Sequence, residues 1–215
     1  MYKITELFTS IEGEGVRSGG LAFFVRLFGC DFDCSYCDTP YSRGNNPYTV
    51  MSADEIVAEY KKSNCVAVTV TGGEPLIHTG IAELLQKIAD AGGKINVETN
   101  GGQDISEFLH IKNLFLTCDY KCPSSGMTGR MRLDNLKKLR RQDALKFVID
   151  NPGDLDAALK IIKDYAPECY IYFSPVYGKT DAGKIVDFVK KHNLNGVRVQ
   201  LQLHKYIYPP DARGV

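Results

Sequence analysis

The sequence predicts an α/β protein whose parallel sheet is curled into an incomplete barrel. Short apolar, β-branched runs alternate along the chain with runs whose apolar residues recur at helical spacing. Each connection between successive strands is long enough for a right-handed βαβ crossover, which favours parallel pairing. We count about six βα units, fewer than the eight of a closed barrel, so we expect a lateral opening.

Seven apolar runs are expected as strands, and the amphipathic runs between them as helices. The expected strands are residues 21–27, 65–71, 94–98, 113–118, 144–149, 169–173 and 197–201. The expected helices are one capped by Ser52 that runs to about Lys62, one that carries Ile81 to Ile88, a basic helix at 131–141, a helix at 154–165 and one capped by Thr180.

Composition points to one domain over residues 1–215 that acts on a small molecule. The chain is 44% hydrophobic, enough for one substantial core, and no apolar run is long enough to span a bilayer. The 26 Lys and Arg balance the 26 Asp and Glu, so net charge gives no reason to expect direct binding of nucleic acid or a membrane. The first residues lack the features of a secretory signal, so we expect a cytoplasmic protein.

The clearest chemical signal is the loop 29–39, in which Cys30, Cys34 and Cys37 are spaced as Cys-x3-Cys-x2-Cys. Three thiolates this close cannot all pair as disulfides, but they can converge as soft ligands on iron or zinc. A cubane cluster held by three cysteines leaves one iron open, and open coordination positions are typical of catalytic metal sites. The odd total of seven cysteines also favours a reducing compartment.

Several polar or glycine-rich segments follow the expected strands. Ligand sites of parallel sheets form at the carboxyl ends of the strands, where Gly72 and Gly73 would let backbone approach a polar ligand. Arg26, in the strand 21–27, either points into such a site or reaches solvent from the strand end, and the spacing favours neither. Lys121 lies in a loop of turn formers, and the aromatic tail 202–215 is expected to pack back and cover the site.

The cysteine loop, with Tyr36 before its last cysteine, and Gly72-Gly73-Glu74-Pro75 after a strand together resemble the radical S-adenosylmethionine (SAM) superfamily. In that superfamily the methionine moiety of SAM chelates the open iron, and an electron from the cluster cleaves the sulfonium to a 5'-deoxyadenosyl radical. The resemblance implies a radical SAM core with a [4Fe-4S] cluster and SAM as cofactors. It makes Cys30, Cys34 and Cys37 the cluster ligands.

Further motifs resemble the 7-carboxy-7-deazaguanine synthase family, particularly its clostridial-type branch. They are residues 10–15, Arg26, Cys37-Asp38-Thr39, Glu98-Thr99-Asn100-Gly101 and residues 202–205. This resemblance implies a lyase of queuosine biosynthesis that converts 6-carboxy-5,6,7,8-tetrahydropterin to 7-carboxy-7-deazaguanine with loss of ammonia and catalytic use of SAM. It also implies Mg²⁺, a flavodoxin or ferredoxin-type electron donor and a homodimer.

The resemblance assigns site residues by position. The substrate contacts it implies are Ile11, Glu12, Gly13, Glu14, Arg26, Thr71 and His204. The SAM contacts it implies are Tyr36, Cys37, Asp38, Gly73, Lys121, Ser174, Pro175 and Val176. Thr39 corresponds to a magnesium ligand, which suits the preference of that ion for oxygen.

The chain departs from the family pattern at three places. Many members have glutamine where Glu12 stands, which leaves open whether the side chain or the backbone meets the substrate. A frequent Ser-Pro-Lys is here Asp119-Tyr120-Lys121, and the chain continues past Pro210, a position at which family members can end.

Two other functions remain open at this point. A radical SAM activase would use the same cluster to generate a glycyl radical on a partner protein. A non-catalytic iron-sulfur or zinc module would need the cysteines but not the double glycine. The other cysteines, Cys65, Cys118, Cys122 and Cys169, are expected as buried thiols rather than ligands of an auxiliary cluster.

Overall fold

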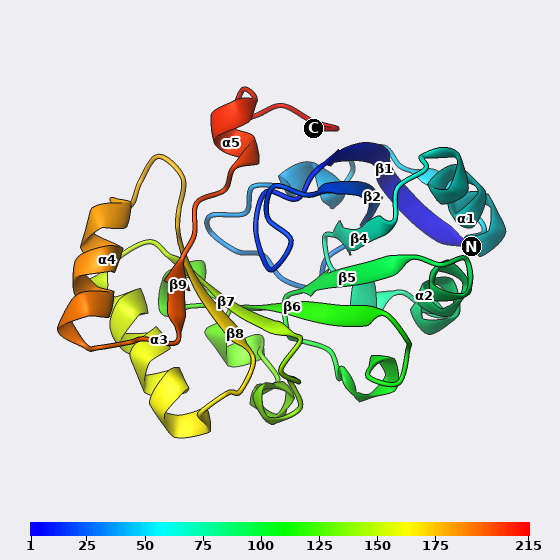
Figure 1. The fold of residues 1–215 in the computed structure, drawn as a ribbon. Coiled ribbons are helices and arrows are strands. Elements are labelled where there is room, and N and C mark those ends of the chain that lie inside the picture. Colours follow the sequence, from blue (N-terminus) through cyan, green and yellow to red (C-terminus); the bar gives the residue numbers. More distant parts are fainter.

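A computed structural model describes residues 1–215 and contains one nine-stranded sheet (Figure 1). In sheet order the strands are β3 (Thr49–Met51), β1 (Tyr2–Ile11), β2 (Leu21–Leu27), β4 (Ala67–Gly72), β5 (Lys94–Thr99), β6 (Leu114–Tyr120), β7 (Ala144–Ile149), β8 (Tyr170–Pro175) and β9 (Val197–Val199). The helices are α1 (Ala53–Lys62), α2 (Ile81–Asp90), α3 (Pro152–Tyr165), α4 (Ala182–Lys191) and the short α5 (His204–Ile207).

The sheet is an open, mostly parallel barrel. Parallel pairing joins β2 to β4 and then each successive strand as far as β9, whereas β1 and β3 are added in antiparallel fashion at one edge. The edge strands β3 and β9 do not pair with each other, so the barrel is incomplete. The predicted fold class is confirmed, with the antiparallel edge formed by β1 and β3 as an addition that the sequence did not indicate.

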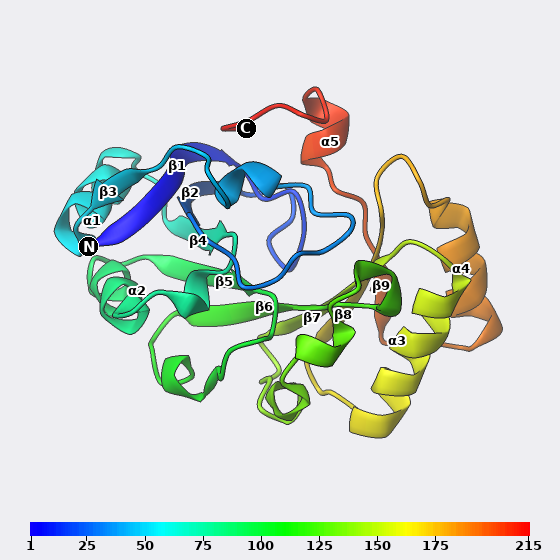
Figure 2. The ribbon, with the colours of Figure 1, turned by 180° about the vertical axis from the view of Figure 1, so that it is seen from behind.

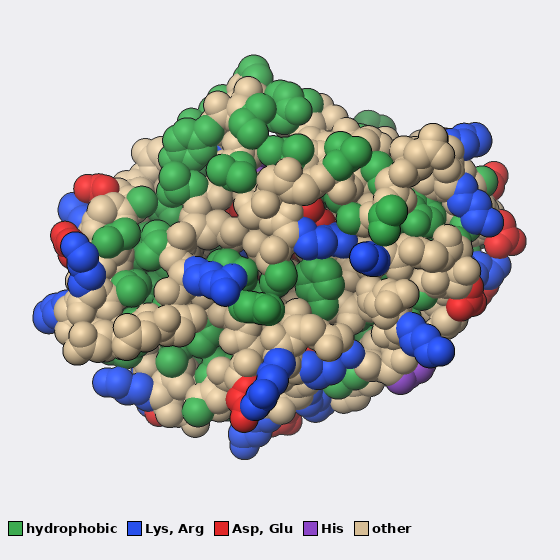
Figure 3. Space-filling view, viewed as in Figure 1, with side chains coloured by type: hydrophobic (Ala, Val, Ile, Leu, Met, Phe, Trp, Pro, Cys, Tyr) green, Lys and Arg blue, Asp and Glu red, His purple; other side chains and the backbone are tan.

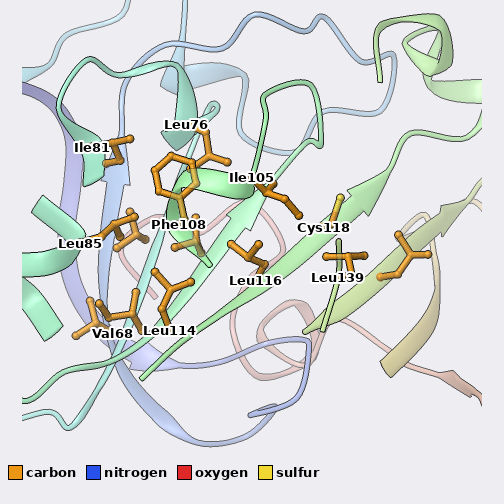
Figure 4. Packing of buried hydrophobic residues seen from close by; sticks show 14 of the residues in the cluster. Val68, Leu76, Ile81, Leu85, Ile105, Phe108, Leu114, Leu116, Cys118 and Leu139 are labelled. Carbon is orange, nitrogen blue, oxygen red and sulfur yellow. The ribbon is translucent and has the colours of Figure 1, made fainter. Parts of the chain in front are cut away.

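The hydrophobic core lies between the outer face of the sheet and the helices (Figure 2; Figure 4). Alternate residues of each strand face it, as in β6, where Leu114, Leu116 and Cys118 are buried in the cluster. Ile81 and Leu85 of α2 belong to the same cluster. Since successive strand residues point to opposite faces, the residues between these apolar ones must face the inside of the barrel.

The predicted basic helix at 131–141 is wrong. Only the 3-10 turn Leu133–Lys137 forms there, because polar side chains bind backbone groups outside the segment. Asn135 Nδ2 donates to the carbonyl of Gln103 (2.7 Å), and the Arg140 guanidinium donates to the carbonyl of Leu109 (2.6 Å) and to the carboxylate of Asp143 (2.9 Å). These contacts replace the intrahelical ladder with tertiary bonds.

The cap expected from Thr180 is also wrong by one residue. Asp181 caps α4, with Oδ1 accepting from the amide of Gly183 (2.8 Å), while the Thr180 hydroxyl donates to the carbonyl of Asp150 (3.0 Å). The cap expected from Ser52 is confirmed, with a complete capping box to Glu55.

The surface in Figure 3 carries charged side chains of both signs among neutral ones, and hydrophobic side chains gather over the tail that carries α5. Tyr206 and Ile207 of that tail are largely exposed. No helix combines the length and the apolar character that crossing a membrane requires.

We predict that Asp143→Asn lowers the free energy of unfolding by about 1.5–3 kcal/mol, because Asp143 is fully buried and accepts from Leu116 N and from Arg140. Chemical denaturation measures this loss. Glu168→Gln is the matched control, because the neighbouring pair of Arg141 and Glu168 is exposed on both sides and should change stability by less than about 1 kcal/mol. Equal effects of the two substitutions would contradict the role given to the buried pair.

Candidate active site

The inner face of the sheet is polar although most of its strands are apolar. Cross-strand bonds show which residues meet there: the Thr71 hydroxyl of β4 donates to the carboxylate of Glu98 on β5 (2.8 Å), and the Thr117 hydroxyl of β6 donates to Asn96 (2.9 Å). Buried polar groups in this position would be costly without partners, and these have them. The inner face is therefore built to hold polar ligands.

A buried lysine stands at the centre of this face. Lys146 of β7 is 7% exposed, and its Nζ lies 3.1 Å from Glu14 Oε2 and 3.1 Å from Asp119 Oδ1. Burial alone would lower the pKa of Lys146, but Asp119, Glu14 and Glu98 together raise that pKa well above its ordinary value. The ammonium stays charged and joins two carboxylates that would otherwise repel each other.

Asp119 extends this pairing to Lys121, whose Nζ lies 3.1 Å from Asp119 Oδ2. Burial would raise the pKa of Asp119, but Lys121 and Lys146 outweigh it and hold the pKa below its ordinary value. Glu98 has the opposite balance, because burial exceeds the effects of Lys146 and Thr71 and raises its pKa to about 7. The face thus mixes charged groups with one carboxyl that titrates near neutrality.

The cysteine loop leaves the end of β2 and returns through the 3-10 turn Pro40–Ser42. Cys30, Cys34 and Cys37 are free and half-buried, and burial is the main cause that raises the pKa of the Cys30 and Cys34 thiols. A bound cation would reverse this, because metal ligation deprotonates a thiol. The three thiols therefore lie unpaired in the loop that follows β2, and their role as cluster ligands stays a prediction.

Gly73 lets the end of β4 touch this loop backbone to backbone. A Cβ on Gly73 would lie 2.1 Å from the carbonyl oxygen of Gly29 and 2.8 Å from Cβ of Cys30. The Gly29 carbonyl accepts from the amide of Glu74 (2.8 Å), and the Gly29 amide donates to Ser42 (2.7 Å). Only glycine fits at position 73 without moving the loop.

Glu74 connects the loop to β5. Its carboxylate accepts from the Leu76 amide (3.0 Å), the Thr99 hydroxyl (2.8 Å) and the Asn100 amide (2.5 Å), and burial raises its pKa to about 7. The Asn100 side-chain amide in turn donates to Asp31 (2.9 Å), within the cysteine loop. Glu74 and Asn100 thus help to fix the loop on the sheet.

The tail that carries α5 contacts the turn 11–15, which follows β1. The Leu203 amide donates to the carbonyl of Gly13 (3.0 Å), and a Cβ on Gly13 would lie 1.9 Å from Nδ1 of His204. Glu14 accepts from the Ser174 hydroxyl (3.1 Å) and from Gln202 Nε2 (3.3 Å). The tail therefore packs back on the body beside the turn 11–15.

Arg26 is mostly buried, which favours the alternative in which it points into a site. Its side chain is 15% exposed, its Nε lies 3.3 Å from Glu6 Oε2, and the guanidinium lies 6.0 Å from the centre of the Tyr41 ring. Val25 and Leu27, its neighbours on β2, belong to the core cluster outside the sheet, so the Arg26 side chain leaves the strand on the inner face. The Arg26 cation therefore acts on the inner face, next to the cysteine loop.

The Glu12 side chain is taken up by the protein itself. Its carboxylate is 2% exposed, pairs with the Arg17 guanidinium (2.5 Å) and accepts a short hydrogen bond from Thr69. Arg17 also donates to the backbone carbonyl of Lys94 (2.6 Å). A ligand at this turn would meet the backbone of Ile11 to Gly13 and not the Glu12 carboxylate.

Four functional side chains were not singled out from the sequence, or received no role: Arg17, Glu98, Lys146 and Gln202. The signal for Lys146 was a single lysine inside the apolar run Ala144–Ile149. Nothing in the sequence indicated a role for Arg17, because only the fold brings its side chain to Glu12 and Thr69.

Several residues expected around the cofactor lie on the same side as the thiols. The Tyr36 hydroxyl is buried without a hydrogen-bond partner, and Lys121 acts electrostatically on both Tyr36 and Cys34. The Thr39 hydroxyl lies 3.9 Å from Cys37 Sγ. Pro175 and Val176 follow Ser174 at the end of β8, where the Val176 amide donates to Ile149 (2.9 Å). The unpartnered Tyr36 hydroxyl is a buried polar group that a polar ligand beside the loop would satisfy.

The four cysteines outside the loop were expected as buried thiols. Cys65, Cys118, Cys122 and Cys169 are buried and free, as expected. Burial raises the pKa of Cys169 to about 11, so this thiol stays protonated at neutral pH.

An open parallel barrel with three free thiols in the loop after its first parallel strand defines a radical SAM enzyme. In agreement, the family profile described as "Radical SAM superfamily" matches residues 25–168. A relative from Clostridium acetobutylicum, named 7-carboxy-7-deazaguanine synthase, is 42% identical over 100% of this chain and 99% of its own length. One of the same name from Methanospirillum hungatei is 40% identical over 97% of this chain and 86% of its own.

The chain belongs to the 7-carboxy-7-deazaguanine synthase family of the radical SAM superfamily. The structure described as "Crystal structure of QueE from Escherichia coli" shares its fold, with a TM-score of 0.76, 20% identity and coverage of 94% of this chain and 93% of that one. The predicted family is confirmed, with a [4Fe-4S] cluster, SAM and Mg²⁺ as cofactors. The non-catalytic iron-sulfur or zinc module is thereby set aside.

We predict that Gly73→Ala prevents normal cluster assembly, because the new methyl group would displace the backbone of Gly29 and Cys30. Iron and sulfide per chain after anaerobic reconstitution should fall severalfold. Gly196→Ala is the control, since a Cβ at Gly196 meets no atom within 4 Å. Full cluster content in Gly73→Ala would show that the close contact does not matter.

Proposed function

We propose that the protein converts 6-carboxy-5,6,7,8-tetrahydropterin to 7-carboxy-7-deazaguanine and ammonia. The observation that carries the proposal is the packing of His204 against Gly13, next to the Glu14 carboxylate that binds Lys146 and Ser174 on the inner face. The full-length similarity to relatives named 7-carboxy-7-deazaguanine synthase supports the same reaction. Product and ammonia together contain all atoms of the substrate, so the reaction needs no net oxidant and is compatible with catalytic use of SAM.

The cofactor side of the site is proposed to hold the cluster through Cys30, Cys34 and Cys37. Bound there, the cluster and SAM supply a hydrogen-abstracting radical. The Gly73 backbone lies against the loop and offers polar groups to the methionine moiety. The other proposed SAM contacts are Tyr36, Cys37, Asp38, Lys121, Ser174, Pro175 and Val176, and Thr39 is the proposed magnesium ligand.

The substrate side is proposed to recognise the two polar ends of the pterin. The Arg26 guanidinium is suited to pair with the substrate carboxylate. The Glu14 carboxylate and the backbone of residues 11–13 accept from and donate to the pyrimidine edge, and Thr71 lies on the same face. Burial lowers the pKa of His204, so its imidazole is neutral at pH 7 and can accept or donate one hydrogen bond.

The tail 202–215 is proposed to cover the bound substrate as part of a single domain that spans residues 1–215. It lies against the turn 11–15, and Lys205 Nζ lies 3.4 Å from Asp38 Oδ2. Arg213 at its end lies 2.8 Å from Glu6, the carboxylate that also holds Arg26. We further propose a cytoplasmic homodimer that receives electrons from a flavodoxin or ferredoxin-type donor.

The alternative of a radical SAM activase is less well supported. An activase must admit a polypeptide segment, whereas here the tail is bound across the turn 11–15. It would also have no use for Arg26 and His204 as a small-molecule pocket.

The direct test is anaerobic reconstitution, reduction and incubation with SAM, with and without 6-carboxytetrahydropterin. We expect 7-carboxy-7-deazaguanine and ammonia in equal amounts, only when the pterin is present. Cys34→Ala should abolish both cluster binding and turnover, because only two loop thiols remain. Formation of 5'-deoxyadenosine without the deazaguanine would contradict the proposed reaction.

A second prediction isolates the substrate contact. Arg26→Ala should leave iron content unchanged but raise KM for the pterin by about tenfold to a hundredfold, because a charge-assisted contact is lost. Arg141→Ala, whose guanidinium is exposed, is the control. An unchanged KM in Arg26→Ala would refute the carboxylate contact.

A further inference from the structure

We propose that Lys146 is a positioning residue that couples the binding of SAM to the binding of the pterin. The inference rests on the proposed function, since it takes both ligands from there. Its basis is the place of Lys146 in the sheet: it lies in register between Asp119 of β6 and Tyr172 of β8, and is nearly inaccessible to solvent. The residue is therefore too deep to be explained as a surface charge.

One side of Lys146 leads to the proposed SAM contacts. Asp119 Oδ1 lies 3.1 Å from Lys146 Nζ, and Asp119 Oδ2 lies 3.1 Å from Lys121 Nζ. Lys121 begins the segment whose Ser124 and Ser125 carbonyls accept from the hydroxyl (2.7 Å) and the amide (3.2 Å) of Ser35, within the cysteine loop. The position of Lys121 thus depends on how strongly Lys146 holds Asp119.

The other side of Lys146 leads to the proposed substrate contacts. Lys146 Nζ donates to Glu14 Oε2 at 3.1 Å, and the same carboxylate accepts from Ser174 and Gln202. Glu14 follows Gly13, which is bound to Leu203 and packed against His204. Lys146 therefore sets the place of the turn and of the tail through a single carboxylate.

Burial makes this arrangement sensitive to charge. The ion pairs of Lys146 with Glu14 and Asp119 lie away from water, where electrostatic interactions are strong and weakly screened. SAM brings cationic groups and the pterin brings a carboxylate, so each ligand alters the charge at one end of the chain Lys121–Asp119–Lys146–Glu14. A change in affinity at one end must then appear at the other by the same factor.

The test measures binding without turnover. Reconstituted, unreduced enzyme is titrated with SAM by calorimetry, alone and with saturating 6-carboxytetrahydropterin, and the reverse titration is made with the pterin. In the unsubstituted enzyme we expect each ligand to tighten the other by about tenfold. The coupling is the ratio of the dissociation constants of one ligand without and with the other. In Lys146→Met this ratio should fall to about one, with iron content unchanged, and Lys146→Arg should restore part of it.

The controls separate coupling from stability. Lys160→Met removes an exposed lysine that pairs with Asp164, and should keep the ratio of the unsubstituted enzyme. If Lys146→Met does not fold, Asp119→Asn interrupts the same chain with little change in volume and should also abolish the ratio.

Three results would overturn the inference: no coupling in the unsubstituted enzyme, a tenfold ratio that survives in both variants, or equal weakening of both affinities with an unchanged ratio. The last result would give Lys146 a structural role only. Failure of the unsubstituted enzyme to bind the pterin would instead refute the proposed function.

Discussion

The structure depends on how a parallel sheet keeps charge inside. Lys146 lies between Glu14 and Asp119, and neither carboxylate is exposed enough for water alone to stabilise its charge. Because β-strand residues alternate between faces, the same strands supply an apolar outer face for the helices and this charged inner face. The inner face is therefore lined with paired polar groups, in contrast to the apolar packing outside the sheet.

The ligand site requires the whole chain. The cysteine loop and Gly73 come from its first half, Lys121 and Lys146 from its second half, and His204 from its tail. Backbone contact between Gly73 and Gly29 fixes the thiols on the sheet, while the bond from Leu203 to Gly13 fixes the tail. The proposed SAM contacts and the proposed substrate contacts are therefore held by the same sheet.

Local sequence signals predicted the parallel strands and the cysteine loop, because apolar runs and cysteine spacing are properties of short segments. They failed where contacts between residues far apart in the sequence determine the local structure. The antiparallel strand β1 was not expected because charged residues interrupt it, and the helix at 131–141 gives way to the contacts of Asn135 and Arg140. The pairing of Arg17 with Glu12 and the depth of Lys146 also depend on tertiary structure, which no spacing along the chain reveals.

The central claim is that this charged inner face holds SAM and the pterin side by side. An anaerobic crystal structure of the reconstituted protein with both ligands tests it most directly. We expect the methionine moiety of SAM at the cluster beside Gly73, and the pterin between Arg26, Glu14 and His204 with its carboxylate on the Arg26 guanidinium. A pterin bound outside the sheet, or an Arg26 that remains paired only with Glu6, would contradict it.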